Sequence, residues 1–289
     1  PTVNGALYFD PGYLANPLVY AGCVGILPTG THPTKPEPGD CIVVIGGRTG
    51  RDGLRGATFS SMEMDHQTGE IAGTAVQIGH PINEKQVQEV ICEARDLQLY
   101  SAITDCGAGG LSSSVGEMAA ELGADVWLDD IPLKYPGLQP WEVWLSEAQE
   151  RMVLAVPPKS VDALKALCDR HQTEGCVIGR FRDDGILNVR HGDVQVGKFD
   201  VHFLHNGIPQ MHLDAVWRFP RIAPLQAEHL PRVASEIQET LLKLLIHPNL
   251  CSRESIVRRY DHEVQGGTAV KPLGGEQGLA PNNGSVIVP

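Results

Sequence analysis

The sequence has no apolar run near the ~18 residues of a membrane-spanning helix, and no charged-then-apolar signal segment opens it. Basic residues are also scarce, because 23 Lys and Arg stand against 35 Asp and Glu, for a formal net charge of −12. Binding to nucleic acid or to an anionic membrane requires clustered Lys and Arg, so neither partner is expected. These absences predict a cytoplasmic chain of the enzyme type.

Paired cysteines are missing as well. The seven cysteines are odd in number and form no C-x-x-C pair. A disulfide framework or a structural zinc site would show tighter spacing, so we expect reduced thiols in a reducing compartment. His202, His205 and His212 come closest to a cluster, but they lack the compact paired ligands that are typical of zinc sites. We therefore interpret them as ordinary histidines.

The 289 residues are 42% hydrophobic and 20% charged, which suits a globular protein of one large or two ordinary domains. Apolar runs predict strands at 41–45, 100–104, 151–156, 176–181, 186–190 and 199–204. Helical spacing predicts helices that begin near Asn83, Ser114, Trp141, Ser160, Leu230 and Ser252. Two of these starts, Asn83 with Gln86 and Ser114 with Glu117, have capping-box spacing. The alternation predicts a mixed α/β fold whose last strands are antiparallel.

Both ends of the sequence contain strand-like stretches without partners. Tyr8-Phe-Asp and Leu18-Val-Tyr have no preceding element to pair with, and the chain closes on Ser285-Val-Ile-Val-Pro289. No initiator Met is present. We therefore expect the chain to be the central piece of a longer polypeptide.

The stretch Gly46-Gly-Arg-Thr-Gly-Arg-Asp-Gly-Leu-Arg-Gly56 is rich in glycine and arginine, and two serines follow it. Glycine lets backbone N–H groups approach an anion, and arginine adds a fork of donors for phosphate. The stretch is not a Walker A sequence, since the G-x-x-x-x-G-K-[ST] order is absent. A flexible surface loop is an equally good interpretation on spacing alone. The phosphate-loop candidates are Arg48, Gly50, Arg51, Gly53, Ser60 and Ser61.

Asp105 stands at the end of a predicted strand, before a glycine-rich turn at 106–110. Open α/β sheets gather ligands outside the carboxyl ends of their strands, and Mg²⁺ takes one or two carboxylates together with phosphates and water. The alternative is an Asp that caps the following turn, which spacing alone favours. Glu147, Gln149, Glu150 and Arg151 could form a polar edge of a site, but spacing alone favours a solvated helix end.

Several motifs, in order along nearly the whole chain, resemble the phosphoribosylformylglycinamidine synthase family of purine biosynthesis. The motifs are Pro1-Thr-Val-Asn-Gly, Phe9-Asp-Pro-Gly-Tyr13, the glycine-arginine stretch with Gly56-Ala-Thr-Phe-Ser-Ser61, Val76-Gln-Ile-Gly79, Ile103-Thr-Asp-Cys-Gly-Ala-Gly-Gly-Leu-Ser112, Ser146-Glu-Ala-Gln-Glu-Arg151 and Tyr260-Asp-His-Glu-Val-Gln-Gly-Gly267. The glycine-arginine stretch and the Gln-Glu-Arg segment are the most specific of them.

The resemblance implies the architecture of aminoimidazole ribonucleotide synthase used twice in one chain, each copy having an N-terminal and a C-terminal α/β domain. Residues 1–37 would end a first N-terminal-type domain, and residues 38–206 would form the first C-terminal-type domain, an α/β domain with mixed sheets. Residues 207–224 would be a linker rich in Pro and Gly, and residues 225–289 would open the second N-terminal-type domain.

The resemblance also implies site residues. Asp105 would be a Mg²⁺ ligand, while Gln77, Glu147, Ala148 and Gln149 would contact formylglycinamide ribonucleotide (FGAR). The family usually has Glu-Ser-Gln where this chain has Glu147-Ala148-Gln149, so Ala148 brings no hydroxyl to that position. The family's catalytic His and ATP-binding Lys precede this segment. We therefore expect no catalytic residue in it, and no activity of the segment alone.

The implied reaction is an ATP-dependent, amidine-forming ligation. ATP, with Mg²⁺, would phosphorylate the formyl-amide oxygen of FGAR, and ammonia would displace the phosphate. A glutaminase domain or subunit would release that ammonia from glutamine. Two alternatives stay open: another member of the same superfamily, of the aminoimidazole ribonucleotide synthase or selenophosphate synthetase type, and a non-catalytic scaffold segment.

Overall fold

The contacts within the chain divide it into two units. One is Leu27–His212, and the other joins Pro1–Ile26 to Leu213–Pro289. The computed structural model describes residues 5–14, 17–32, 35–54, 79–219, 230–259, 263, 266–282 and 284–288. In these ranges no helix is both long enough and apolar enough to cross a bilayer.

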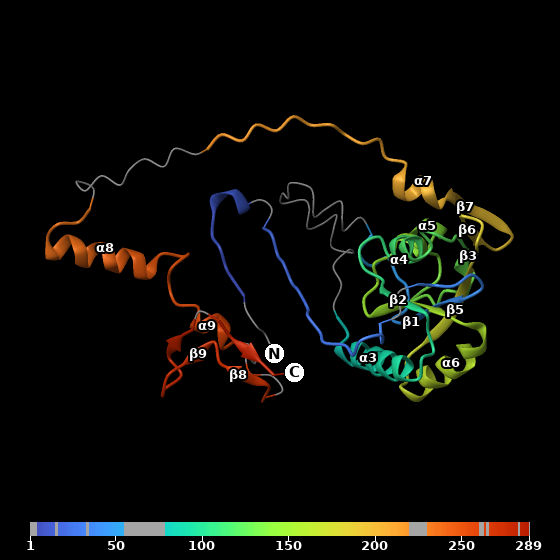
Figure 1. Cartoon of the computed structure of the whole chain (residues 1–289), viewed down its shortest axis with the longest axis horizontal. Coiled ribbons are helices and arrows are strands. Elements are labelled where there is room, and N and C mark those ends of the chain that lie inside the picture. The colour runs from blue at the N-terminus through green and yellow to red at the C-terminus, as the bar shows by residue number, and fades with distance from the viewer. Residues whose placement is uncertain are drawn as a thin grey trace. The chain divides into compact units, whose positions relative to one another are not determined.

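A seven-stranded mixed sheet forms the centre of the unit Leu27–His212. Its strands are β1 (Cys41–Gly46), β2 (Ala102–Asp105), β3 (Ala124–Trp127), β4 (Arg151–Val156), β5 (Gly175–Phe181), β6 (Ile186–His191) and β7 (Val194–Asp200). They lie in the order β2-β4-β1-β5-β3-β6-β7, and each neighbouring pair is antiparallel except β3 with β6. The predicted mixed α/β fold is confirmed, and Figure 1 shows helices on both faces of the sheet.

Strand β1 lies inside the sheet and divides the core in two. Cys41, Val43 and Ile45 belong to one buried cluster, whereas Ile42 and Val44 belong to the other. A strand with both faces covered is apolar at every position rather than at alternate ones. This double burial is the physical reason for the uninterrupted apolar run that predicts the strand.

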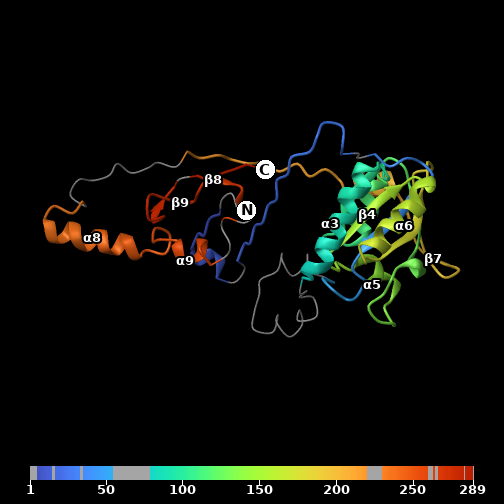
Figure 2. The same cartoon turned by 90° about the horizontal axis from the view of Figure 1, so that it is seen from below.

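Two layers of helices cover the sheet. On one face lie α3 (Pro81–Asp96) and α6 (Val161–Arg170), which contact each other (Figure 2). On the other face lie α4 (Leu111–Met118), α5 (Pro140–Leu145) and α7 (Val201–Asn206). Each helix turns an apolar stripe toward the strands, and the predicted helical spacing is confirmed in α3, α4, α5 and α6.

Two predicted helix starts are wrong. Helix α3 begins at Pro81 rather than after Asn83, because His80 Nδ1 accepts the N–H of Asn83 (3.0 Å) and caps the helix. Helix α4 begins after Gly110, whose φ is 58°, and Ser114 is buried within the helix. Since Ser114 Oγ donates to the Gly110 carbonyl (3.1 Å), this serine bonds backward along the helix and does not cap it.

Two predicted elements end earlier than expected. Helix α5 stops at Leu145, and the residues from there to Glu150 connect it to β4. The strand predicted at 199–204 is a strand only as far as Asp200, where β7 ends. The carboxylate of Asp200 accepts the N–H of Phe203 (2.8 Å), and this cap starts α7 in place of a longer strand.

The second unit consists of short elements. Among its described residues, the helices are α8 (Ala234–Ile246) and α9 (Glu254–Val257), and the short 3-10 helix η1 covers Pro11–Tyr13. Two small antiparallel sheets follow in the chain, in which β8 (Thr268–Val270) pairs with β11 (Val286–Ile287) and β9 (Leu273–Gly274) pairs with β10 (Ala280–Pro281). The strand predicted at the end of the chain is confirmed as β11.

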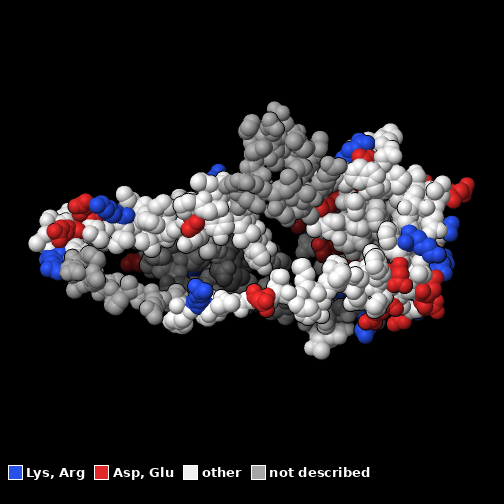
Figure 3. Space-filling view, turned by 90° about the horizontal axis from the view of Figure 1, so that it is seen from above, with Lys and Arg blue, Asp and Glu red and all other residues white. Residues whose placement is uncertain are grey.

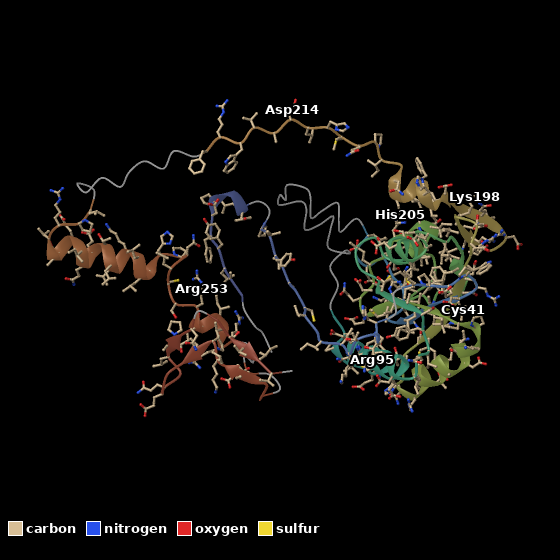
Figure 4. All side chains as sticks on the ribbon, in the orientation of Figure 1. Cys41, Arg95, Lys198, His205, Asp214 and Arg253 are labelled. Atoms are coloured by element: carbon tan, nitrogen blue, oxygen red, sulfur yellow. The ribbon has the colours of Figure 1, made fainter. Side chains whose placement is uncertain are left out.

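The strands predicted at 8–10 and 18–20 are wrong. A strand needs a hydrogen-bonded neighbour, and no strand runs beside either stretch in the part of the chain that the structure describes. The side chain of Asn249 serves the backbone of Phe9 instead, accepting its N–H (2.6 Å) and donating to its carbonyl (2.9 Å). The guanidinium of Arg253, a residue that Figure 4 labels, lies over the ring of Phe9, 5.6 Å from its centroid.

Acidic and basic side chains lie beside one another on the surface. Figure 3 shows this mixture on the face that it draws. Arg182, for example, forms ion pairs with Asp125 and with Asp184, each at 2.6 Å. Asp125 and Asp184 therefore each have a neighbouring basic group, although the chain as a whole stays acidic.

Candidate functional site

Three of the predicted site segments meet at the same end of three neighbouring strands. Strand β4 is antiparallel to both β1 and β2, and its first residues pair with their last ones. Arg151 is paired with Gly46, and Met152 is paired with Asp105. The register thereby brings together the glycine-arginine stretch, the turn after Asp105 and the connection 146–150.

Glu147 links these three segments. Its N–H donates to the carbonyl of Asp52 (2.8 Å), and its Oε1 accepts the N–H of Gly109 (3.1 Å). Gly53, with a φ of 67°, comes so close that a Cβ added there would lie 2.3 Å from Glu147 Cβ. Close approach and left-handed backbone both require glycine at this position.

Glu150 holds the end of the connection that leads into β4. Its φ of 53° is unusual for a residue with a side chain, and such backbone persists only where neighbours hold it. The Glu150 carbonyl accepts the N–H of Gly47 (3.0 Å), and Glu150 Oε1 accepts the N–H of His80 (2.9 Å). Because His80 caps α3, Glu150 ties the start of that helix to the connection 146–150.

Two hollows open on the connection 146–150. The first has a volume of about 410 Å³, and Asp105, Gln149 and Glu150 are among the residues that line it. The second, of about 710 Å³, shares Gln149 and Glu150 and is lined by Arg48 as well. Gln149 therefore belongs to both hollows, with Asp105 in one and Arg48 in the other.

The remaining predicted residues are placed less directly, or lie outside the described residues. Ala148 is 1% exposed, so its methyl group and its backbone are both buried. A Cβ at Gly50 would lie 2.7 Å from Asp52 Oδ2, which again explains a glycine by close contact. Gln77, Ser60 and Ser61 fall outside the residues that the structure describes.

Both described arginines of the glycine-arginine stretch bind carboxylates. Arg48 Nε donates to Glu174 (2.8 Å), while Arg51 donates to Glu142 (2.7 Å from Nε) and to the Gly137 carbonyl (3.1 Å from Nη2). The hydrogen bonds to Glu174 and Glu142 raise the pKa of the Arg48 and Arg51 guanidinium groups, respectively. A phosphate at this stretch would compete with the two carboxylates for the same donors, so phosphate binding stays a prediction.

Asp105 is the predicted metal ligand. It is exposed at the end of β2, and no hydrogen bond or ion pair to another described residue engages its carboxylate. Within the described ranges, no group of three or more His, Cys, Asp and Glu side chains could hold a metal ion. Mg²⁺ needs only one or two carboxylates where phosphate and water complete its coordination. A carboxylate that no other described residue engages, beside a hollow, fits that requirement.

Sequence reasoning did not anticipate Glu142 or Glu174 as parts of this site, nor the burial of Arg151. The two glutamates pair with arginines that are 91 and 126 positions away in the chain. No local pattern reports such distant pairs. Arg151 is buried and opens a strand that is otherwise apolar, and a charged residue at the start of a buried run is the signal that could have revealed it.

Replacing Glu142 by glutamine is expected to make the stability of this unit less sensitive to acid. Arg51 first, and the N–H of Gln139 second, donate to the carboxylate and lower the pKa of Glu142. The ionised carboxylate therefore stabilises the fold above the unfolded-state pKa of about 4.3. That contribution is lost as the pH falls through the lower pKa of the folded state.

Urea unfolding between about pH 7 and about pH 3 measures this effect through the free energy of unfolding. We expect a smaller fall in that free energy for Glu142→Gln than for the unaltered chain. Equal falls in the two proteins would show that Glu142 does not contribute to the acid sensitivity.

Residues 37–192 match the family model described as "AIR synthase related protein, C-terminal domain". The chain is also similar to the phosphoribosylformylglycinamidine synthase subunit PurL of Methanopyrus kandleri, with 40% identity over 279 residues. That similarity covers 94% of this chain and 38% of the relative. The chain thus spans less than half the length of the curated relatives that it matches.

Two solved structures of PurL from T. maritima are similar to this chain. The structure complexed with FGAR has a TM-score of 0.59 and 31% identity, and covers 68% of this chain and 33% of that chain. The structure complexed with ATP has a TM-score of 0.55 and 28% identity, and covers 68% of this chain and 30% of that chain. These likenesses agree with the mixed sheet and the helix layers described above.

Proposed function

The chain belongs to the family of AIR synthase related proteins, whose C-terminal domain it contains, and from this premise we propose that it is part of an ATP-dependent ligase. The ligase converts FGAR, ATP and ammonia to formylglycinamidine ribonucleotide in purine biosynthesis. The observation that carries the proposal is the similarity to a PurL structure complexed with FGAR. The similarity to a PurL structure complexed with ATP supports the nucleotide as the second substrate.

In this proposal, the hollow beside Asp105 receives FGAR. Gln77, Glu147 and Gln149 orient it, while the buried Ala148 separates Glu147 from Gln149 in the chain. A glutamine amide offers one acceptor and two donors without net charge, so it positions a ligand rather than stabilising phosphoryl charge. ATP phosphorylates the formyl-amide oxygen, and ammonia then displaces the phosphate to give the amidine.

Phosphate groups are assigned to the glycine-arginine stretch. Arg48, Arg51, Ser60 and Ser61 would donate to phosphate oxygens, and Gly50 and Gly53 would let the backbone approach. Arg48 would then leave Glu174 and Arg51 would leave Glu142, and both would bind phosphate instead. A doubly charged phosphate attracts a guanidinium group more strongly than a single carboxylate does.

Asp105 is assigned to Mg²⁺. When bound, the ion would stabilise the charge that develops on the phosphoryl oxygens. The part of Asp105 is to fix the ion beside the hollow that Gln149 also lines, so that FGAR and the nucleotide phosphates meet there.

The wider organisation belongs to the same proposal. Residues 1–37 and 225–289 are assigned to two N-terminal-type domains, residues 38–206 to the C-terminal-type domain between them, and residues 207–224 to a linker. The ligase would work in the cytoplasm, with a glutaminase domain or subunit as the source of ammonia.

Calorimetric titration of the chain with FGAR tests the proposal. We expect the unaltered chain to bind FGAR, and Gln149→Ala to raise the dissociation constant about fivefold, since a neutral hydrogen bond contributes about 1 kcal/mol. Gln195→Ala is the matched control, because Gln195 lies on β7 with its amide bonded to Asn188 (3.4 Å). No binding by the unaltered chain would contradict the proposed substrate, and equal affinity of Gln149→Ala would remove Gln149 from the site.

A further inference from the structure

A buried guanidinium group lies directly behind the connection 146–150. It belongs to Arg151, the first residue of β4, which is 4% exposed. Burial lowers the pKa of this guanidinium, because the charged form loses its hydration. Its hydrogen-bond acceptors are one hydroxyl and two carbonyls, with no carboxylate among the described residues. A buried charge without an ionic partner is costly unless its hydrogen bonds are well made.

Those hydrogen bonds converge on the connection 146–150. Arg151 Nε donates to the Ala148 carbonyl (3.0 Å), and Nη2 donates to the Ser146 carbonyl (2.5 Å). The third nitrogen, Nη1, donates to Thr49 Oγ1 (2.8 Å) in the glycine-arginine stretch. Because the guanidinium is planar and rigid, its fork fixes the three acceptors relative to one another.

The acceptor in the glycine-arginine stretch is itself firmly held. Thr49 is 1% exposed, its N–H donates to the Pro132 carbonyl (2.9 Å), and its carbonyl accepts the N–H of Lys134 (2.8 Å). Arg151 therefore joins the connection to an anchored residue on one side and to the sheet, through β4, on the other. The carbonyls of Ser146 and Ala148 cannot turn without breaking this arrangement.

The two fixed carbonyls determine where the neighbouring side chains point. Each carbonyl belongs to the peptide plane that leads into the next residue, which is Glu147 after Ser146 and Gln149 after Ala148. Holding both planes sets the direction in which the side chains of Glu147 and Gln149 leave the backbone. A ligand that bonds to both side chains needs this preorganisation to bind without a further entropy cost.

We propose that Arg151 is a positioning residue, which fixes the backbone of residues 146–149 through its three hydrogen bonds and thereby presents Glu147 and Gln149 to the substrate. The effect on FGAR rests on the proposed function, but the effect on the backbone does not. Arg151 acts through the connection and donates its hydrogen bonds to protein acceptors, so removing the fork should change the order of the connection as well as the affinity.

Arg151→Lys tests this role, because lysine keeps the charge and the aliphatic stem but loses the fork. We expect the dissociation constant for FGAR to rise about tenfold, as the loss of more than one charge-assisted hydrogen bond implies. Hydrogen–deuterium exchange without ligand should quicken at the amides of Glu147 and Ala148, which are bonded to the Asp52 carbonyl (2.8 Å) and to Ser146 Oγ (3.3 Å). Exchange in β1 and β5 should stay unchanged.

Two further variants complete the experiment. Arg182→Lys is the matched control, since Arg182 pairs with Asp125 at the exposed end of the sheet, and it should alter neither measurement. Thr49→Val removes only the Nη1 acceptor and should shift both measurements in the same direction as Arg151→Lys, by less. It also provides the answer if Arg151→Lys does not fold.

The possible outcomes separate the inference from the proposed function. If the unaltered chain does not bind FGAR, the proposed function fails, and the exchange measurement alone decides whether Arg151 fixes the connection. Weaker FGAR binding with unchanged exchange would make Arg151 a direct ligand contact and overturn the positioning role. Faster exchange in every strand alike, or wild-type behaviour in both measurements, would overturn it too.

Discussion

Gly46→Ala is expected to lower the free energy of unfolding by about 3 kcal/mol or more, the sum of a strained φ and an overpacked contact. The φ of Gly46 is 108°, and a Cβ there would lie 1.9 Å from the Glu150 carbonyl oxygen. Neither backbone can easily retreat. Gly46 donates its N–H to the Glu174 carbonyl (2.9 Å), and the Glu150 carbonyl accepts the N–H of Gly47 (3.0 Å).

Gly116→Ala is the control for this prediction. Gly116 lies in α4, and outside its own helix no heavy atom of the described residues lies within 4 Å of an added Cβ, so alanine there should stabilise the helix by up to about 1 kcal/mol. Guanidinium-induced unfolding, followed by circular dichroism, gives both free energies. If Gly46→Ala does not lower the free energy of unfolding relative to Gly116→Ala, the close approach of β1 to the connection 146–150 is wrong.

Asp105→Asn is expected to lower ATP turnover about tenfold or more, where a factor of ten is about 1.4 kcal/mol. Asparagine keeps the shape of the side chain but removes the charge that attracts Mg²⁺. Excess Mg²⁺ should recover part of the loss, whereas excess FGAR should not. The substitution is assayed in a polypeptide of the relatives' full length that carries this segment.

A coupled assay of ADP release, with FGAR and free ammonia, measures this turnover without any glutaminase. Asp193→Asn is the matched control, because Asp193 lies in the exposed turn between β6 and β7. Unchanged turnover and unchanged Mg²⁺ dependence in Asp105→Asn would remove Asp105 from the metal site. A loss that excess FGAR reverses would point to a substrate contact instead.

The sequence predicts the sheet and its helices well where one physical cause dominates. The run 41–45 is apolar throughout because both faces of β1 are covered, so its pattern alone identifies a buried strand. In α3, Val87, Val90 and Ala94 repeat at helical spacing because that face packs on the sheet. Burial therefore determines which positions are apolar, and the resulting runs and repeats predict these elements from the sequence.

The ends of elements are harder to predict, since single side chains decide them. The helix cap at His80 is an uncommon residue type for this role. Its Nδ1 accepts the N–H of Asn83, so the helix begins before the residue that the capping-box spacing predicts as its start. Asp200 ends a strand and starts a helix with one carboxylate. Residues 8–10 have a strand-like composition, but among the described residues no strand pairs with them. The side chain of Asn249 forms the hydrogen bonds to the Phe9 backbone instead.

The candidate site combines both situations. The resemblance to a family supplied Asp105, Glu147 and Gln149, which spacing alone would have left as surface residues. Their meeting depends on the register of β4 with β1 and β2, a long-range pairing that no local pattern encodes. The buried fork of Arg151 depends on the same register, because its acceptor Thr49 is 102 positions away in the chain.

Hydrogen–deuterium exchange of the chain with and without FGAR tests most directly whether the connection 146–150 and the turn after Asp105 form the substrate site. We predict that FGAR slows exchange at residues 105–109 and 146–151, while α6 and β7 exchange at the same rate as in the free chain. Unchanged exchange at both 105–109 and 146–151, at FGAR concentrations where calorimetry detects binding, would contradict the placement of the site at this end of the sheet.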